Sequence, residues 1–407
     1  MSNLNSSQQF RRIFHIDLDT FFVSAERVRN PSLIGLPVLV GGIAPIRGVV
    51  TCASYESRAF GIKAGMPVSV AKRLCPSSII VPTDLKYYKN ISQKFIEILS
   101  EYCPFLETLG LDEAYMDMTG FESLNGPPSS SALVLKRRIV EELGITASVG
   151  IASSKPVAKV ASALSKPNGL LEIPFGEDST FLAPLPIGKL PGIGNSTERK
   201  LRVMGLQTIG ELAGTSEIEV SATLGKVGLS LHKMANGLDQ TPVIVERETK
   251  SIGREFTFQK DTNDLSYVKK ALRNLVEHVC YDLRLQSKQA KTIELKIRWS
   301  DFATQTRQTT VKTPSDLEDF LYEQAVGMLN LEMETETKSS NRPIRLIGFR
   351  LSQLEERMLQ KRFLTDCFGG GSQLEDLSRA LFDIRKKFGI GSIRKPTAKK
   401  TGVFSWR

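Results

Sequence analysis

The chain has 407 residues, more than one ordinary hydrophobic core accommodates, so we expect roughly two to four domains. Its composition, 41% hydrophobic and 24% charged, is typical of a globular protein. No apolar run approaches the ~20 residues that span a bilayer, so no membrane partner is expected. The formal net charge of +10 fits a polyanionic partner such as nucleic acid, and it equally fits a merely basic protein.

Five cysteines and three histidines are scattered along the chain without a CxxC pair. This pattern argues against a disulfide scaffold and against a zinc site, and it fits a reducing cytoplasm. Residues 1–9 are polar and do not resemble a signal peptide, so we expect a disordered lead on a cytoplasmic protein. Because the cysteines and histidines are scattered, any metal chemistry must depend on carboxylates.

The chain up to about residue 174 mixes short apolar runs with helix-period segments. Strands are expected at 12–19, 36–40, 48–53, 108–111, 114–118 and 146–151, and helices at 20–29, 88–101, 131–143 and 155–165. The strands 108–111 and 114–118 flank Asp112 and Glu113. This arrangement predicts a β-hairpin that carries an acidic pair.

Beyond residue 174 the composition shifts to short helices broken by glycine, and then to an extended linker at 241–250. A β-α-β-β-α-β order follows. Its elements are expected at 251–258, 265–286, 292–299, 305–311, 316–329 and 344–351, and one amphipathic helix follows at 374–388.

Four carboxylates lie at the ends of short apolar runs. Asp17 and Asp19 are two residues apart on one predicted strand, so their side chains would share a face. Asp112 and Glu113 are consecutive and can turn towards one ion only at a hairpin tip. Acids at such places are costly to bury unless they are paired or bind metal, and Mg²⁺ prefers carboxylate oxygens. The alternative is that each acid is a solvated strand end.

Four ordered motifs bear on this choice: DLDTFFVSAE, VVTCASYESRAFGIKAGMPVSVAKRLCP, LGLDEAYMDMTG and GIASSKPVAKVASALSKPNG. With them the chain resembles the Y-family, or translesion, DNA polymerases, most closely the DinB-type (DNA polymerase IV) branch. The resemblance extends from about Phe10 to Glu355. It implies an α+β multidomain fold of the right-hand type, with palm, fingers and thumb plus a C-terminal β-α-β-β-α-β little finger.

The resemblance also implies where each domain lies. The expected ranges are 10–25 and 85–174 for the catalytic palm, 26–84 for the fingers, 175–240 for a thumb with a helix-hairpin-helix, 241–250 for the linker, 251–355 for the little finger and 356–407 for the C-terminal tail.

In this resemblance, Asp17, Asp112 and Glu113 match the family's catalytic, metal-binding acids, and the Leu18 carbonyl is a further ligand. The implied reaction adds a dNTP to the primer 3′ end of primer–template DNA by two-metal phosphoryl transfer. Two Mg²⁺ ions are expected, which Mn²⁺ can replace, with low processivity and no proofreading. Asp19 is a candidate orienting acid and stays unassigned.

Phe22 matches the family's steric gate, an aromatic ring that leaves no room for a ribose 2′-hydroxyl. Taken alone, Phe21 and Phe22 would be a pair of core aromatics. Tyr55, Arg58 and Lys166 match the family's triphosphate contacts, because a guanidinium fork, a hydroxyl and an ammonium all bind phosphate oxygens. Outside these motifs each would be a solvated surface group.

The chain departs from the family's pattern at two positions. Gly110 stands where a serine is usual in the SxDEA motif, and Ala163 replaces an acid of the following motif. A hydroxyl near the acids is thereby lost, but no expected metal ligand is missing.

Several further positions are candidate DNA or partner contacts. The LPGIG turn with Gly192 and Gly194 resembles a helix-hairpin-helix, which binds phosphates through backbone N–H groups without reading sequence. The little-finger candidates are Lys250, Ser251, Arg254, Lys296, Arg298 and Arg307. Gln360, Phe363 and Leu364 loosely match a sliding-clamp-binding peptide, and the chain is expected to act as a monomer.

Two other functions remain open from the residues alone. One is a repair nuclease that combines a helix-hairpin-helix with two-metal acids, and the other is a catalytically silent DNA-binding scaffold. A nuclease needs neither the gate aromatic nor the SYESR motif, and a scaffold needs none of the acids.

Overall fold

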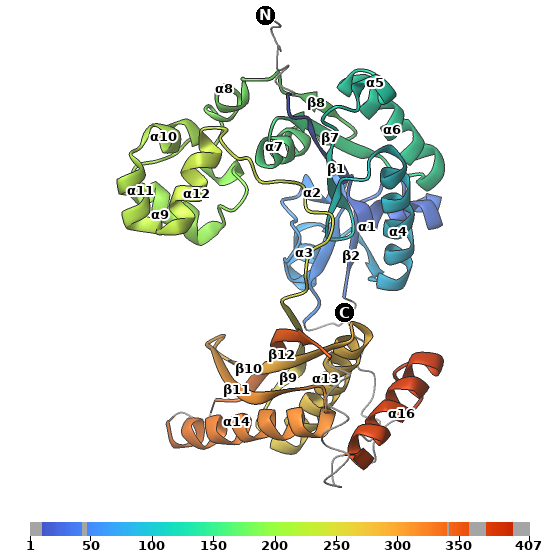
Figure 1. Ribbon diagram of the computed structural model, residues 1–407, viewed down its shortest axis with the longest axis vertical. Helices are drawn as coiled ribbons and strands as arrows, with labels where there is room; N and C mark the ends of the chain where they lie inside the picture. The colour runs from blue at the N-terminus through green and yellow to red at the C-terminus, as the bar shows by residue number, and fades with distance from the viewer. Residues whose placement is uncertain (1–9, 43–46, 340–341, 358–371, 394–407) are drawn as a thin grey trace, which may run out of the picture. The chain divides into compact units, whose positions relative to one another are not determined.

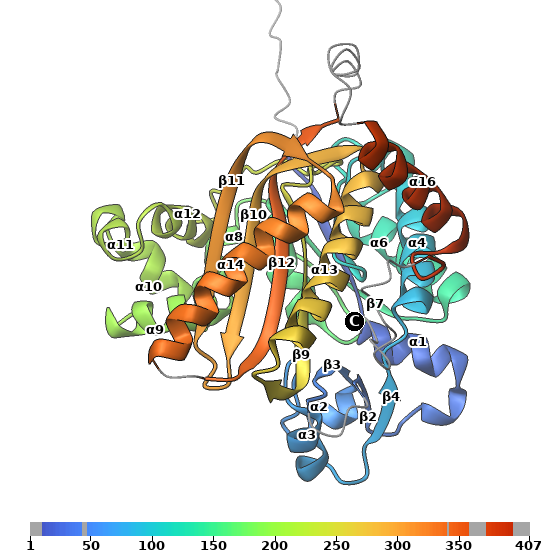
Figure 2. The same ribbon diagram turned by 90° about the horizontal axis from the view of Figure 1, so that it is seen from below.

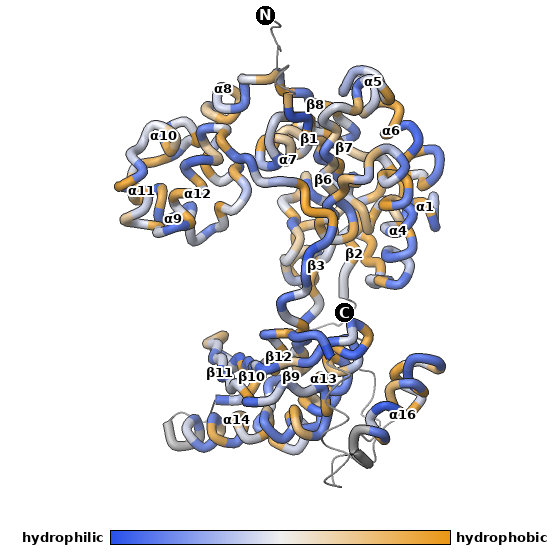
Figure 3. Tube along the Cα trace, in the orientation of Figure 1, coloured by the Kyte–Doolittle hydropathy of each residue, from blue (hydrophilic) through white to orange (hydrophobic). Residues whose placement is uncertain are grey.

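The computed structural model describes residues 10–42, 47–339, 342–357 and 372–393 (Figure 1). The chain divides into two compact units, one ending at Arg247 and one beginning at Glu248. Hydrophobic and hydrophilic residues alternate along the helices of both units (Figure 3). Within the described ranges, no helix is long and apolar enough to cross a membrane.

The first unit is built on a mixed five-stranded sheet with the order β5-β6-β1-β7-β8. The strands are β1 (Ile13–Leu18), β5 (Leu106–Leu109), β6 (Glu113–Asp117), β7 (Ala147–Ala152) and β8 (Leu170–Glu172). β1 lies at the centre and pairs antiparallel with both β6 and β7. Because helices cover both faces, β7 is buried at every position.

Side chains of β1 alternate between two cores, as the period of a strand requires. Phe14, Ile16 and Leu18 join the core beneath α1 (Phe21–Arg29), α4 (Leu85–Tyr102) and α6 (Pro128–Leu143). Ile13 faces α7 (Lys155–Ser165) on the opposite side, and Asp17 shares this parity. Gly150 in β7 allows α7 to approach, since an added Cβ would lie 2.0 Å from the Ala158 carbonyl oxygen.

A smaller sheet with the order β3-β2-β4 projects from this core. Its elements are η1 (Pro31–Leu33), β2 (Val38–Gly41), β3 (Val50–Ala53), α2 (Tyr55–Arg58), α3 (Val68–Leu74) and β4 (Ile79–Pro82). A separate small core that includes Leu39, Ile62 and Cys75 supports it.

The unit also contains a helical segment that follows β8. Its elements are α8 (Asp178–Leu182), η2 (Ile187–Lys189), α9 (Asn195–Val203), α10 (Ile209–Gly214), α11 (Glu217–Leu224) and α12 (Lys226–Ala235), and the short α5 (Glu122–Asn125) lies earlier in the chain. Residues 238–250, all described, then run without helix or strand.

The second unit is an antiparallel four-stranded sheet with the order β11-β10-β12-β9. The elements are β9 (Ser251–Thr262), α13 (Leu265–Leu285), β10 (Lys288–Trp299), β11 (Thr304–Ser315), α14 (Glu318–Ser339) and β12 (Ile344–Glu356). The predicted β-α-β-β-α-β order is therefore confirmed. Both helices lie on one face of the sheet (Figure 2).

A last helix, α16 (Ser372–Phe388), packs against α13 and α14. The Phe382 ring lies 5.6 Å from Tyr281, and the buried Arg385 guanidinium donates to Glu318 at 2.8 Å. The predicted helix 374–388 is thus confirmed, and it packs against the second unit.

Candidate active site

The three predicted acids meet at the ends of two neighbouring strands. Asp17 of β1 and Glu113 of β6 are direct cross-strand partners in the antiparallel register. Asp112 lies in the turn between β5 and β6, and its carbonyl accepts a hydrogen bond from the Leu18 N–H at 2.8 Å. The hairpin therefore brings acids from distant parts of the chain together.

This crowding changes how readily the acids ionise. Burial raises the pKa of Asp17, and the Lys166 ammonium only partly offsets this effect. Burial, together with the negative charges of Asp17 and Glu113, raises the pKa of Asp112 to about 6. A cluster of buried like charges is the condition that a bound cation relieves. Three carboxylates beside the Leu18 carbonyl supply the hard oxygen ligands that Mg²⁺ prefers, so the residues fit a divalent cation.

Two lysines hold the acids in this conformation. Lys166 Nζ lies 2.5 Å from Asp17 Oδ1, and Lys159 Nζ lies 2.5 Å from Glu113 Oε2. His15 Nε2 is 3.2 Å from the same Glu113 oxygen. Burial alone would raise the pKa of Glu113, but hydrogen bonds from His15 and Lys159 outweigh it and lower this pKa. In the described part of the chain, no three acidic, histidine or cysteine side chains already stand in the geometry of a metal site, and two of the three acids here are paired with lysines.

Lys159 and His15 were not predicted as site residues. Lys159 lies on α7, whereas Lys166 is the extended C-cap residue that follows this helix, so helical periodicity does not relate the two side chains. His15 has the parity of Asp17 on β1, and its Nδ1 lies 2.7 Å from Ser162 Oγ on α7.

The two adjacent phenylalanines have different environments. Both line a cavity of about 180 Å³, but Phe21 is only 3% exposed and belongs to the core, whereas Phe22 is half-buried. Asp17, Asp112 and other predicted site residues line the same cavity. Phe22 stacks on the buried Tyr88 ring at 4.4 Å with an interplanar angle of 16°, which fixes its orientation.

Tyr55 and Arg58 lie on α2, which begins after the N-cap Ser54. Arg58 lines the cavity with the acids, and its Nε donates to the Ala53 carbonyl at 3.0 Å. Its guanidinium carbon lies 5.1 Å from the centre of the Tyr55 ring. Lys166, which directly follows α7, lines the same cavity.

The expectation that Asp17 and Asp19 lie on one strand is wrong, because β1 ends at Leu18. Asp19 is 2% exposed and accepts hydrogen bonds at 2.8 Å from Thr146 Oγ1, Ser148 Oγ and the Asn168 N–H. The Tyr55 hydroxyl is a further donor at 3.4 Å. Asp19 thus fixes the loop that carries Lys166.

The two departures from the family's pattern have simple structural settings. Gly110 has φ of +74°, a backbone conformation in which a serine would be strained. Ala163 lies at an exposed position of α7. Neither departure disturbs the contacts among the acids.

The predicted hairpin between helices lies in the helical segment of the first unit. Gly192 has φ of +92°, and Gly194 is the N-cap of α9 with open space where a Cβ would lie. The Glu198 carboxylate packs against Gly188: a Cβ added to Gly188 would lie 2.7 Å from Glu198 Oε2. A negative charge therefore lies close to this turn.

The six little-finger candidates do not share one surface. Arg254 donates to Asp282 of α13 at 2.7 Å, and Arg307 donates to Glu332 of α14 at 2.6 Å, so both point to the helix-covered face. The reason is strand parity, which sequence inspection did not assign. The other four, on or beside the open face, are Lys250, Ser251, Lys296 and Arg298.

The open face also carries a shallow cavity of about 250 Å³ that sequence inspection missed. Gly253 and Gly348 lie in it on neighbouring strands, and Arg350, with 54% of its side chain exposed, lines it. Lys296 lines it as well, paired with Glu255 at 2.7 Å. Glycines beside exposed cations make a surface that another molecule can approach closely.

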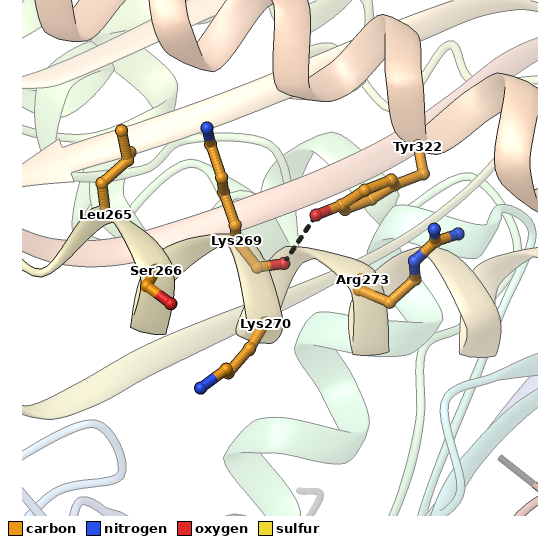
Figure 4. A pocket seen from close by; sticks show the side chains of 6 residues that line it. All are labelled: Leu265, Ser266, Lys269, Lys270, Arg273 and Tyr322. Atoms are coloured by element: carbon orange, nitrogen blue, oxygen red, sulfur yellow. Dashed lines mark hydrogen bonds between the residues drawn. The ribbon is translucent and has the colours of Figure 1, made fainter. Parts of the chain in front are cut away.

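A further cavity of about 370 Å³ lies between α13 and α14 (Figure 4). The Arg273 guanidinium covers the Tyr322 ring at 3.8 Å and also pairs with Asp319 at 2.8 Å. Lys269 and Lys270 complete its basic lining. None of these residues was predicted as a site residue. The candidate clamp residues Gln360, Phe363 and Leu364 lie outside the described residues.

Family profiles match most of the chain. The impB/mucB/samB family matches residues 16–163, and its C-terminal domain matches residues 249–362. A profile described as the DNA polymerase-iota thumb domain matches residues 188–239. Together they cover most of the acid-bearing sheet, of the helical segment and of the second unit.

Curated relatives and solved structures agree with these profiles. A DNA polymerase IV of Dehalococcoides mccartyi is 42% identical over 386 residues, which cover 94% of this chain and 96% of the relative. One from Desulfatibacillum aliphaticivorans is 38% identical over 96% of this chain and 97% of its own.

Among solved structures, a Y-family DNA polymerase chimera of Dbh and Dpo4 superposes with a TM-score of 0.75 at 28% identity, over 85% of this chain and 99% of the chimera. An insertion ternary complex of Dbh DNA polymerase gives 0.58 at 28% identity, over 85% of this chain and 99% of its own. With these matches, the chain belongs to the Y-family of DNA polymerases, in the DinB-type branch that contains DNA polymerase IV.

Proposed function

We propose that this protein is a template-directed translesion DNA polymerase that adds dNTPs to a primer 3′ end, with low processivity and no proofreading. The observation that carries the proposal is that Asp17, Asp112, Phe22, Arg58 and Lys166 line one cavity, with Glu113 beside Asp17 on the neighbouring strand. Relatives named DNA polymerase IV, aligned over 94% and 96% of this chain, support it.

In this proposal Asp17, Asp112, Glu113 and the Leu18 carbonyl hold two Mg²⁺ ions, which Mn²⁺ can replace. When bound, such ions lower the pKa of the primer hydroxyl and neutralise the triphosphate and the leaving pyrophosphate. The hydroxyl then attacks the α-phosphate. The raised pKa of Asp112 supports this assignment, because a carboxylate crowded by like charges gains most from a cation.

Lys166 has two positions in this scheme. Without metal its ammonium neutralises Asp17 at 2.5 Å, and with metal bound it is released to the triphosphate. Arg58 and Tyr55 face the same triphosphate from α2. The guanidinium is already oriented by its bond to the Ala53 carbonyl, so little side-chain entropy is lost on binding.

Phe22 is the steric gate in this proposal. Its stacking on the buried Tyr88 leaves the ring little freedom, so a 2′-hydroxyl on an incoming sugar meets a rigid wall. Steric exclusion of this kind discriminates by a clash and needs no contact with the correct substrate.

The proposed domains keep their predicted ranges: palm at 10–25 and 85–174, fingers at 26–84, thumb at 175–240, linker at 241–250, little finger at 251–355 and a tail from 356. In the little finger, the open face of the sheet binds the DNA backbone through Lys250, Ser251, Lys296, Arg298 and Arg350. Such contacts are independent of sequence and sensitive to salt. The hairpin at Gly192 and Gly194 is proposed as a further backbone contact.

We also propose that the protein acts as a monomer in the cytoplasm and meets a sliding clamp through Gln360, Phe363 and Leu364. The free thiols of the four described cysteines are compatible with a reducing compartment.

Primer extension tests the proposal. The protein is mixed with primer–template, dNTPs and Mg²⁺, and the primer length is followed over time for the wild type and for Asp112→Ala. We expect lengthening by the wild type only. Shortening of the primer would indicate a nuclease, and no change with the wild type would contradict the proposal.

A further inference from the structure

A buried carboxylate near the active site takes no part in the acid cluster. Glu107 of β5 is 1% exposed. Its Oε2 accepts hydrogen bonds from Lys155 Nζ at 2.8 Å and from the Ile244 N–H at 2.9 Å, and its Oε1 accepts one from Arg247. Because an unpaired buried carboxylate is costly, these three donors are what keep it charged.

Two of the three donors belong to the segment that leaves the first unit. Ile244 and Arg247 are 137 and 140 residues away from Glu107 in sequence. Lys155 Nζ adds a bond to the Pro242 carbonyl at 2.9 Å, and the Arg11 guanidinium donates to the Thr241 carbonyl. The segment has no helix or strand, so side chains of the first unit satisfy backbone groups that secondary structure would otherwise satisfy.

The anchored segment ends where the first unit ends. Arg247 is the last residue of that unit, and Glu248 is paired within the second unit with Lys288 at 3.4 Å. β9 begins at Ser251. Glu107 thus fixes the connecting segment as far as Arg247, the last residue of the first unit.

We infer that Glu107, with Lys155 and Arg247, forms a latch, that is, a set of contacts that holds the connecting segment against the first unit. The latch keeps the free tether between the first and second units short and thereby strengthens the binding of both units to one DNA molecule. The inference rests on the proposed function, because it takes both units to bind the same DNA. Release of the latch would free residues 242–247, and an extended chain of that length reaches about 20 Å further.

A longer tether lowers the effective concentration of one unit at a DNA molecule held by the other. This concentration falls roughly as the −3/2 power of tether length. Extending the free tether from 248–250 to 242–250 triples its length, so DNA affinity should fall about fivefold. The chemical step within a formed complex should not change.

The test uses full-length protein with Glu107→Gln, which keeps the side-chain size, and with Arg247→Ala, whose side chain is 58% exposed and leaves the Glu107–Lys155 pair intact. Glu246→Gln is the matched control, because it removes a charge from the same exposed segment without touching Glu107. Hydrogen exchange of the Ile244 amide reports the latch directly, and affinity for primer–template reports its consequence.

We expect the Ile244 amide to exchange at least tenfold faster in Glu107→Gln than in the wild type and in Glu246→Gln, with a smaller increase in Arg247→Ala, which keeps the bond from Ile244 to Glu107. DNA affinity should fall about fivefold in Glu107→Gln. The sign is diagnostic, because loss of a negative charge by itself would raise affinity for DNA. Unchanged exchange, or faster exchange with undiminished affinity, would overturn the latch. If the wild type shows slow exchange at Ile244 but binds no primer–template, the proposed function fails instead.

Discussion

The two main sheets of this protein place their charged groups in opposite ways. In the five-stranded sheet, β7 is buried at every position and the acids lie where β1 and β6 meet the turn that carries Asp112. In the four-stranded sheet, β10 alternates between buried residues and half-exposed polar ones such as Lys296 and Arg298. The first arrangement gathers charge at a point, and the second spreads it along a face.

The distribution of charge indicates what each sheet is suited to bind. Burial, together with repulsion from Asp17 and Glu113, raises the pKa of Asp112 to about 6. Acids gathered at such a point favour a small multivalent cation. Charges spread along a face barely interact, and they suit an extended polyanion whose contacts are individually weak. Substitutions at the strand ends should therefore have large effects, and substitutions along the open face should have small, salt-dependent ones.

The largest effect is expected at the crowded acids. Asp112→Asn keeps the side-chain size and removes a charge that a cation needs, so primer extension should fall by roughly 1,000-fold. Single-turnover extension at saturating dNTP measures this loss. The control is Glu101→Gln, an acid whose side chain is 61% exposed on α4, which should extend primers at the wild-type rate. Comparable losses in both variants would contradict the special role of the strand ends.

The next effect concerns the paired phenylalanines. Phe22→Ala removes the ring that lines the cavity, so discrimination between dNTPs and rNTPs should fall about 100-fold. Phe21→Leu changes the neighbouring core residue and should lower thermal stability while leaving sugar discrimination intact. The ratio of kcat/KM for matched dNTP and rNTP measures both. Equal sugar discrimination in the wild type and in Phe22→Ala would show that Phe22 is not the steric gate.

A smaller effect separates the two faces of the four-stranded sheet. Arg298→Ala on the open face should weaken primer–template binding several-fold and reduce the slope of log affinity against log salt by about 1. Arg254→Ala on the helix face should leave that slope unchanged, because its partner is Asp282. Binding titrations at several salt concentrations distinguish them. The same change of slope in both variants would show that strand parity does not decide DNA contact.

The smallest effect is expected at the hairpin turn that carries the acids. Gly110→Ser restores the family's usual residue but places a side chain at φ of +74°, so it should cost about 1 kcal/mol of unfolding free energy. Ala163→Asp, at an exposed position, should change stability by less than about 0.5 kcal/mol. Chemical denaturation measures both values. A stabilising Gly110→Ser would contradict the strain argument.

Much of this architecture could be predicted because local patterns specify it. Continuous apolar runs located β1 and β7, and the flanks of Asp112 and Glu113 predicted the hairpin that the structure confirms. Helix α7 has the predicted bounds Lys155–Ser165. Motif order added the identity of the acids and the gate, whose roles stay predictions.

Other features depend on tertiary geometry that no local pattern encodes. Asp19 was placed on the strand of Asp17, yet its oxygens accept hydrogen bonds from Thr146, from Ser148 of β7 and from the loop after Lys166. The faces of Arg254 and Arg307 depend on strand register, which a one-residue shift reverses. The bond between Glu107 and Ile244 joins positions 137 residues apart, so it emerges only from the fold.

The count of divalent cations bound by the assembled site tests the central claim most directly. Mn²⁺ binding can be followed by electron paramagnetic resonance, with primer–template and a non-hydrolysable dNTP present, in the wild type and in Asp112→Asn. We expect two tightly bound Mn²⁺ ions per wild-type chain and the loss of at least one in the variant. Equal Mn²⁺ binding by the two proteins would contradict this expectation.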